Sequence, residues 1–586
     1  MTPLILACFL LLLQSSYSEF VQKADTFDGI LTSDQLLAWG FDESATIIDL
    51  SGKKIDSIDD FTFQNYADLT ELYVGFNNIA SIDADTFSGL TNLKILDIGY
   101  NKIAVLSDTC FENLPSLEIL IAEHNNITSI DAEIFHPLIS LKSLDLQNNE
   151  LTVINGNPFE FMTNIEEIFL SYNQLSQIVT ENFAGLTQLT TLNLQNNMIS
   201  SIDADAFQDL INLDTLYLTK NELTSLDSSI FQNQEKLLFL FILENQISKI
   251  EGNLFSALTE LEILDISYNS IDTIDPFSFQ NLKKLAFFYM GNNQLTEIET
   301  DTFSGLSGMK ILFVENNNIA TIQPNSFDTL ASLIELDLSY NNINSIDSTL
   351  FSKLKLEELA LVQNSISILD LSTFTGQSKL VVLELGYNML DIIPNGLFDD
   401  LVSLLNLDLS YNQITYISEK AFSKLKKLED LELSGNKITD LELETFKGTP
   451  NLEFLLLDDN QIREIIPDLF LNLPNMYILD LNGNHIALLH SRMFQGMPSI
   501  LEIELSNNRI SFVGNNEFNN FPILYRLNLS KNKLQYLDYN TFQGSHRLHY
   551  LCLGENQFPT GFEVNLAGLD SLTNSETFLT DTDACL

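Results

Sequence analysis

The chain has 586 residues, and its 28 Lys and Arg residues stand against 80 Asp and Glu residues, so the formal net charge is −52. Such a polyanion repels nucleic acid and anionic membranes, whereas basic protein surfaces and cations are favoured as partners. The charge also keeps a long, leucine-rich protein soluble, which is the simpler explanation for it.

The first eighteen residues have the pattern of a secretory signal peptide. The apolar run from Leu4 to Leu13 is too short to span a bilayer, and the small residues Ser16 and Ser18 precede a cleavage position before Glu19. A buried core strand is the alternative. The rest of the sequence has no apolar run long enough for a membrane helix, and residues 573–586 are polar and acidic. We therefore expect a secreted protein with no membrane span.

Residues 19–44 precede the repeats and contain no Cys. We expect them to form an N-terminal cap in which apolar side chains cover the first edge strand. The candidates are Leu36, Leu37, Trp39 and Phe41.

An internal repeat then organises residues 45–560. An Asn recurs every 24 residues from Asn77 to Asn341, one step of 23 leads to Asn364, and the longer period resumes as far as Asn556. A Phe follows the same period from Phe63 to Phe542. A sustained period of this length predicts a solenoid, here of about 22 repeats, in which neighbouring repeats share one core. Residues 561–586 are expected to form a C-terminal cap and tail.

Each repeat carries the motif L-x-x-L-x-L-x-x-N-x-I, as in Leu93, Leu96, Ile98, Asn101 and Ile103. In L-x-L the side chains alternate between the two faces of a strand, so the Leu faces the core and x faces solvent. The Asn amide suits the corner after the strand, because it bonds neighbouring backbone groups. The Phe is expected to fill the other half of each coil. The recurrent S-I-D segment is interpreted as capping of free backbone N–H groups by Asp.

This motif resembles the extracellular leucine-rich-repeat family, and the 24-residue length with its Phe matches the typical class. The resemblance covers about residues 45–560. It implies an α/β solenoid, a horseshoe with a parallel β-sheet on the concave face and short helices or turns on the convex face. The chain looks like Toll-type ectodomains, chaoptin-like adhesion proteins and secreted carriers similar to the acid-labile subunit. Members of this family usually have cysteine-rich caps, which residues 19–44 lack.

The solvent-facing strand positions are the candidate binding surface. In the middle repeats they are aromatic, and exposed aromatic side chains on adjacent strands mark interaction sites. A different strand register, which would bury them, is the alternative. The candidate residues for contact with a protein ligand are Tyr217, Phe239, Phe241, Phe287, Tyr289 and Phe313.

Further along the chain the same positions become acidic. Closely spaced like charges repel, so a basic ligand or a cation would relieve the repulsion. A solvated acidic face is the alternative. The acidic row comprises Glu384, Asp408, Glu432, Asp480 and Glu504.

Two glycosylation sequons begin at Asn126 and Asn528, and a glycan on Asn528 would cover the last repeats. Cys8 belongs to the signal segment. Cys552 and Cys585 are a candidate disulfide that closes the end of the solenoid, and Cys110, beside Phe111, is expected to be a buried thiol.

The sequence has no recognisable catalytic motif, metal-ligand spacing or phosphate-binding loop. We therefore expect no enzyme, no metal site and no cofactor. The leading hypothesis is a secreted recognition protein that holds an extracellular protein ligand or receptor on its concave face. The alternative is a structural component of the extracellular matrix, or a cell-adhesion component, that self-associates as a homo-oligomer.

Overall fold

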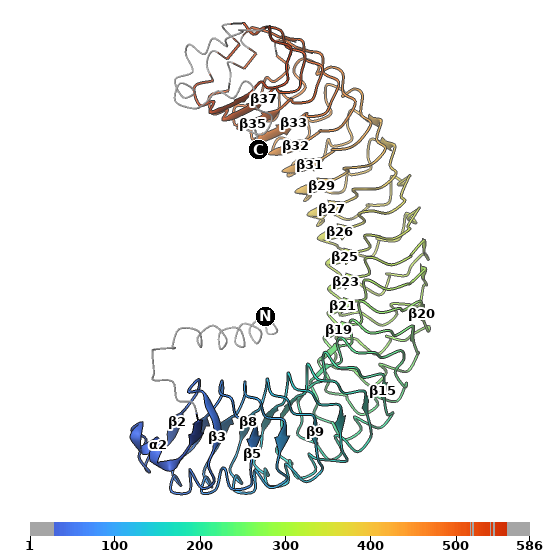
Figure 1. The fold of residues 1–586 in the computed structure, drawn as a ribbon. Helices are drawn as coiled ribbons and strands as arrows, with labels where there is room; N and C mark the ends of the chain where they lie inside the picture. The colour runs from blue at the N-terminus through green and yellow to red at the C-terminus, as the bar shows by residue number, and fades with distance from the viewer. Residues whose placement is uncertain are drawn as a thin grey trace. The chain divides into compact units, whose positions relative to one another are not determined.

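The computed structural model describes residues 29–490, 492–515, 517–518, 521–538, 541–542 and 545–559. The predicted signal peptide at 1–18 and the predicted tail at 561–586 lie outside these residues. The chain is a parallel β-solenoid of about 22 turns that divides into two compact units (Figure 1). Unit 1 holds the residues up to 247 together with 253–258, and unit 2 holds 248–252 and the residues from 259 onward.

Unit 1 begins with β1 (Gly29–Leu31) and α2 (Ser33–Ala38), and β1 pairs in parallel with β3 (Ile55–Ile58). The Thr32 hydroxyl caps α2 by accepting a hydrogen bond from the Gln35 backbone N–H at 3.4 Å. Leu36 is buried, as the cap hypothesis requires, but Leu37 is 52% exposed. A six-residue helix packed on one side turns only one of two adjacent leucines toward the core.

The main sheet of unit 1 consists of three-residue parallel strands, one for each repeat. They are β2 (Ile47–Asp49), β4 (Glu71–Tyr73), β6 (Ile95–Asp97), β8 (Ile119–Ile121), β10 (Ser143–Asp145), β12 (Glu167–Phe169), β14 (Thr191–Asn193), β16 (Thr215–Tyr217) and β17 (Phe239–Phe241). Two-residue strands pair along the side of the repeats: β5 (Ser81–Ile82) with β7 (Val105–Leu106), β9 (Ser129–Ile130) with β11 (Val153–Ile154), and β13 (Gln177–Ile178) with β15 (Ser201–Ile202).

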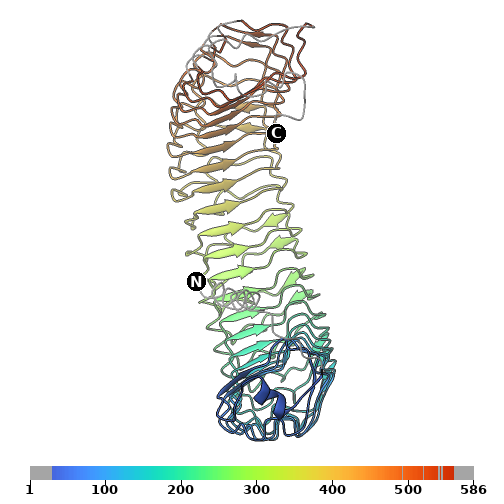
Figure 2. The same cartoon turned by 60° about the vertical axis from the view of Figure 1, so that its left-hand side comes forward.

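The main sheet of unit 2 has the same construction and lines the concave side of that unit (Figure 1). Its strands are β19 (Ile263–Asp265), β21 (Phe287–Tyr289), β23 (Ile311–Phe313), β25 (Glu335–Asp337), β26 (Glu358–Ala360), β27 (Val382–Glu384), β29 (Asn406–Asp408), β31 (Asp430–Glu432), β32 (Phe454–Leu456), β33 (Ile478–Asp480), β35 (Glu502–Glu504), β37 (Arg526–Asn528) and β38 (Tyr550–Cys552). Figure 2 shows these arrows side by side.

Two-residue strands again pair along the side of unit 2: β18 (Lys249–Ile250) with β20 (Thr273–Ile274), β22 (Glu297–Ile298) with β24 (Thr321–Ile322), β28 (Ile392–Ile393) with β30 (Tyr416–Ile417), and β34 (Leu488–Leu489) with β36 (Phe512–Val513). Apart from α2, the described residues contain no helix. The sequence predicts either short helices or turns on the convex side of the repeats, and the structure has turns there.

The recurrent Phe forms the buried spine that the sequence predicts. Phe135 and Phe159 stack at 6.1 Å between ring centroids in unit 1, and Phe398 and Phe422 stack at 6.2 Å in unit 2. All four rings are fully buried. Each repeat therefore contributes one ring to an apolar column that no repeat could bury alone.

The recurrent Asn joins each repeat to the one before it. The Asn101 carboxamide oxygen accepts the Ile79 N–H at 3.0 Å, and its nitrogen donates to the carbonyls of Val74 and Ile98 at 3.0 and 3.1 Å. The pattern recurs along both units, for example at Asn412. Backbone groups at the buried corner would otherwise lack partners, so the amide is required there.

Convex-side Asp residues also cap backbone groups, although they cap turns rather than helices. The Asp227 carboxylate accepts the Ser229 N–H at 2.9 Å and the Ser229 hydroxyl at 2.6 Å. Asp347 makes the same pair of bonds with Thr349.

One buried side chain accommodates the 23-residue repeat, which lacks one residue between Phe351 and the next strand. The Gln377 carboxamide oxygen accepts the Leu356 N–H at 3.2 Å. Its nitrogen donates to the carbonyls of Phe351 and Leu354 at 2.8 and 3.1 Å. Gln377 thus satisfies backbone groups that the shortened segment leaves inside the core.

Candidate functional site

Each three-residue strand turns its middle residue into the core and its two outer residues away from it. We call the first residues of the strands the leading row and the third residues the trailing row. In β16, for instance, Leu216 is buried while Thr215 and Tyr217 are half-buried. Neighbouring strands pair without a shift, so side chains of one row stand about 4.8 Å apart. The strand register predicted from L-x-L is confirmed.

The aromatic residues of unit 1 lie at its last two main-sheet strands. Tyr217 and Phe241 are paired in the trailing row, and their rings stack with centroids 4.9 Å apart and planes 7° apart. Phe239 stands in the leading row beside Thr215. The three rings form a half-buried apolar surface outside the core.

The aromatic residues of unit 2 lie on β21 and β23. Tyr289 and Phe313 are neighbours in the trailing row and meet edge to face, with ring centroids 5.4 Å apart. Phe287 stands in the leading row between Ile263 and Ile311. Of the residues that the sequence groups as one patch, three therefore belong to unit 1 and three to unit 2.

A carboxylate group flanks the aromatic pair of unit 2. Burial, and then the charges of Asp337 and Asp265, raise the pKa of Glu315 to about 7. One of its carboxylate oxygens is buried without a hydrogen-bond partner. Burial, and then the charge of Asp265, also raise the pKa of Tyr289. The surface around these rings is therefore both apolar and negative.

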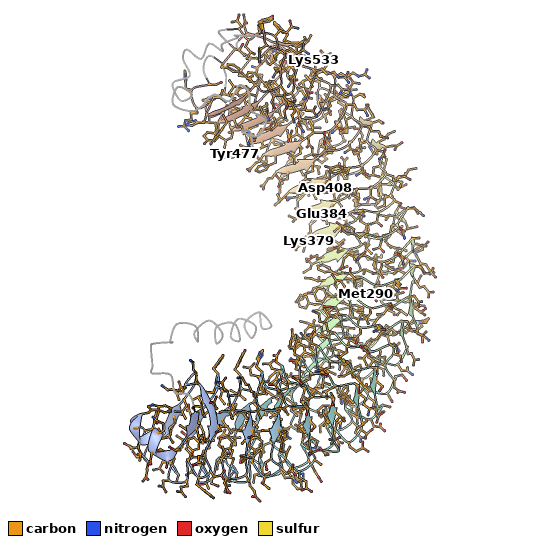
Figure 3. All side chains as sticks on the ribbon, viewed as in Figure 1. Met290, Lys379, Glu384, Asp408, Tyr477 and Lys533 are labelled. Carbon is orange, nitrogen blue, oxygen red and sulfur yellow. The ribbon has the colours of Figure 1, made fainter. Side chains whose placement is uncertain are left out.

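The acidic row occupies the trailing row of unit 2. Glu384, Asp408 and Glu432 are direct neighbours on β27, β29 and β31, and Leu456 separates them from Asp480 and Glu504. Figure 3 shows Glu384 and Asp408 on the concave side of unit 2.

Burial and mutual repulsion disfavour the charged forms of these side chains. Burial, and then the charge of Asp408, raise the pKa values of Glu384 and Glu432. Burial raises the pKa of Asp480 to about 6 and that of Glu504 to about 7. A cation bound beside the row would therefore stabilise the charged forms of these carboxylates.

The comparisons with known proteins agree with this architecture. A family model described as "Leucine rich repeat" matches residues 67–127 and, in overlapping segments, residues 211–558. A model described as "BspA type Leucine rich repeat region (6 copies)" matches residues 104–238.

The chain belongs to the leucine-rich-repeat family.

Solved structures show the same fold for this leucine-rich-repeat chain. The TLR13–ssRNA13 complex is 26% identical, with a TM-score of 0.57, over 92% of this chain and 86% of that chain. The plant peptide hormone receptor RGFR1 in complex with RGF2 is 22% identical, with a TM-score of 0.59, over 94% and 91%. The Toll–Spätzle complex of Drosophila is 20% identical, with a TM-score of 0.54, over 88% and 72%. No curated protein matches the chain.

The leucine-rich-repeat chain also carries an aromatic row that sequence reasoning missed. It lies at the residue before the recurrent Asn, where the backbone is left-handed, as at Tyr100 with φ 51°. Phe76, Tyr100 and His124 stack at 4.3 and 4.1 Å, and Tyr387 and Tyr411 stack at 4.4 Å. The signal was the recurrence of an aromatic residue directly before Asn.

Sequence reasoning also missed two carboxyl groups in the trailing row of unit 1. Burial raises the pKa of Asp97 to about 6 and that of Asp145 to about 7. Asp97 accepts the Gly99 N–H at 2.8 Å, and Asp145 accepts the Gln147 N–H at 3.0 Å.

The two sequons of the leucine-rich-repeat chain differ in accessibility. Asn126 is exposed, whereas Asn528 is 8% exposed and its side-chain oxygen accepts the Ser530 N–H at 3.0 Å. The trailing-row position predicted for Asn528 is observed on β37. Asn126 is therefore the more accessible acceptor in the folded protein.

The two cysteines among the described residues, Cys110 and Cys552, are both buried. Cys110 is a free thiol and only 1% exposed, as expected, and burial raises its pKa strongly. Cys552 is buried on β38, while its predicted partner Cys585 lies outside the described residues.

The described part of the chain contains no group of three or more His, Cys, Asp or Glu side chains suited to a metal ion. Nor does that part contain a helix long and apolar enough to cross a membrane.

Proposed function

We propose that the chain is a secreted recognition protein that holds an extracellular protein ligand or receptor on the outward rows of its main sheets. The observation that carries the proposal is the set of aromatic side chains that face away from the core on adjacent strands. Packing does not require large rings there, because Leu216, Leu240 and Leu312 already fill the core positions between them. Aromatic side chains in such positions dominate binding energy at protein interfaces.

The structural neighbours support binding in general. One is a receptor in complex with the peptide RGF2, and another is the Toll–Spätzle complex. A third is a complex with single-stranded RNA. The net charge of −52 disfavours a nucleic-acid ligand for this chain, because phosphate and carboxylate groups repel each other. A protein ligand fits the charge and the aromatic surfaces better.

The competing hypothesis is a structural component that self-associates. A disulfide-linked assembly through Cys110 is disfavoured by the burial of its thiol. Edge-to-edge association would still give oligomers that grow with protein concentration.

Partner capture from native extracellular fluid tests the proposal. Two variants remove the aromatic surface of one unit each: Tyr217→Ala/Phe239→Ala/Phe241→Ala in unit 1 and Phe287→Ala/Tyr289→Ala/Phe313→Ala in unit 2. We expect the wild-type chain to retain a protein that at least one variant loses, with circular dichroism showing that both variants fold. Identical captured proteins for all three would refute recognition by the aromatic rows. Concentration-dependent oligomers without a captured protein would favour the structural role.

A further inference from the structure

An arginine side chain on the main sheet of unit 2 pairs with carboxylates of that sheet, and this contact indicates which chemistry the carboxylates can bind. The Arg526 guanidinium on β37 lies 3.2 Å from the Glu502 carboxylate and 3.1 Å from the Glu504 carboxylate. These two acids are the leading and trailing residues of the neighbouring strand β35. One guanidinium thus forms ion pairs with a carboxylate of the leading row and with a carboxylate of the trailing row.

Two other strands of unit 2 have the same arrangement, with one acidic residue on each side of the buried middle residue. Glu335 and Asp337 flank Leu336 on β25, and Asp430 and Glu432 flank Leu431 on β31. Among the described residues, neither pair has an ion-pair partner; the ion pairs found in unit 2 use other carboxylates.

The neighbouring strands explain why these pairs lack a cation. The position next to Asp430, which corresponds to that of Arg526 beside Glu502, is occupied by Phe454. The position next to Glu335 is occupied by Glu358. One carboxylate oxygen of Asp430 is buried without a hydrogen-bond partner. A buried carboxylate oxygen left in this state is unfavourable, and a cation from outside would satisfy it.

The surface between the two pairs is acidic as well. Glu358, Glu384 and Asp408 stand on the intervening strands, and the aromatic pair Tyr289–Phe313 adjoins β25 on the other side. A ligand that crosses these strands therefore meets an apolar surface first and then carboxylates.

We propose that this face of unit 2 binds a polypeptide segment in which apolar residues adjoin at least two arginine or lysine residues. The apolar end packs on Tyr289 and Phe313, and the basic residues bind at Glu335/Asp337 and Asp430/Glu432. This inference rests on the proposed function and specifies the chemistry of its ligand.

The strand spacing sets the spacing of the basic residues. From β25 to β31 the sheet advances by four strands, through β26, β27 and β29, which is roughly 19 Å at about 4.8 Å for each step. An extended peptide covers that distance in about six residues. Two basic residues about six positions apart match the two acid pairs.

A labelled synthetic peptide provides the probe. It carries apolar residues at one end and two arginines about six residues apart; a second peptide has glutamates in place of the arginines. Fluorescence anisotropy with the full secreted chain measures the Kd. We expect the arginine peptide to bind and the glutamate peptide not to bind.

Two variants with equal charge separate this site from the general negative charge. Glu335→Gln/Asp337→Asn/Asp430→Asn/Glu432→Gln removes both acid pairs. Asp391→Asn/Asp399→Asn/Glu442→Gln/Glu464→Gln removes four exposed carboxylates of unit 2 outside the main sheet. We expect the first to weaken arginine-peptide binding at least about tenfold and the second less than about twofold.

Several results would overturn the inference: equal loss in both variants, binding of the glutamate peptide, or no binding of the arginine peptide by the wild-type chain. The first variant should fold, because neutral side chains relieve the repulsion between Glu335 and Asp337 and between Asp430 and Glu432. Its melting temperature checks this. If the probe fails while the aromatic variants still lose a captured protein, the inference fails and the proposed function stands. If the probe binds as expected and no aromatic variant loses a captured protein, the peptide chemistry inferred for the acid pairs stands. Recognition of a native protein by the aromatic rows then fails.

Discussion

The main sheets of the two units have the same buried layer but different outward rows. In the trailing row of unit 1, Asp97 and Asp145 alternate with Ile121, so each carboxylate has apolar neighbours in its row. In unit 2, Glu384, Asp408 and Glu432 are consecutive. Repeats with the same core can thus carry isolated or contiguous charges, because outward side chains do not take part in the packing that defines the repeat.

The largest expected effect tests whether the two cores are equivalent. Phe255→Ala in unit 1 and Phe398→Ala in unit 2 each remove a fully buried ring of the spine. Each should lower the free energy of unfolding by about 3–5 kcal/mol, from lost burial and the cavity left behind. Denaturant unfolding measures this, with the half-buried Phe241→Ala as the control, which should cost less than half as much. If only one of the two variants lowered the free energy of unfolding, the spine would stabilise the two units unequally.

A smaller effect is expected at the 23-residue repeat, where unit 2 departs from the regular period. Gln377→Ala removes three hydrogen bonds and leaves the Leu354 carbonyl and the Leu356 N–H without these partners in the core, whereas the Phe351 carbonyl still accepts the Leu354 N–H at 2.9 Å. We expect a loss of about 2–3 kcal/mol in unfolding free energy. The exposed Gln413→Ala is the matched control and should be neutral. Equal stability of both variants would contradict the role assigned to Gln377.

The smallest expected effect is the dependence of stability on pH in the two sheets. The pKa values of Asp145 and Glu504 are raised to about 7 by burial, so the folded state holds these protons more tightly than the unfolded state does. Their contribution to stability is fully present below their ordinary pKa values near 4 and is lost as pH rises toward about 7. The melting temperature should therefore fall between about pH 5 and pH 8.

Neutral variants locate this effect. Asp145→Asn and Glu504→Gln should each flatten the pH profile. The opposite behaviour is expected of Asp227, whose pKa is lowered by its hydrogen bonds to Ser229, so its contribution is lost only at more acidic pH. A melting temperature that rises from pH 5 to pH 8 would contradict the assignment.

Much of the candidate site could be predicted from sequence because strand alternation has a period of two. Once L-x-L is assigned to a strand with the leucines inside, Tyr217 and Tyr289 must face outward. The aromatic row before the recurrent Asn was harder to predict, since the left-handed backbone at Tyr100 and Tyr387 lies in a turn, where strand alternation no longer applies.

The sequence by itself determined the repeat length, the buried Phe and Asn, the strand register and the identity of every outward row, because each repeat must bury the same set of side chains against its neighbours. Only the tertiary structure decided which side chains of different repeats meet. It placed Arg526 between Glu502 and Glu504, turned Gln377 into the gap of the short repeat, and left the acid pairs of β25 and β31 without an ion-pair partner among the described residues. Contacts between residues about 24 positions apart depend on how adjacent coils stack, and a single repeat does not contain that information.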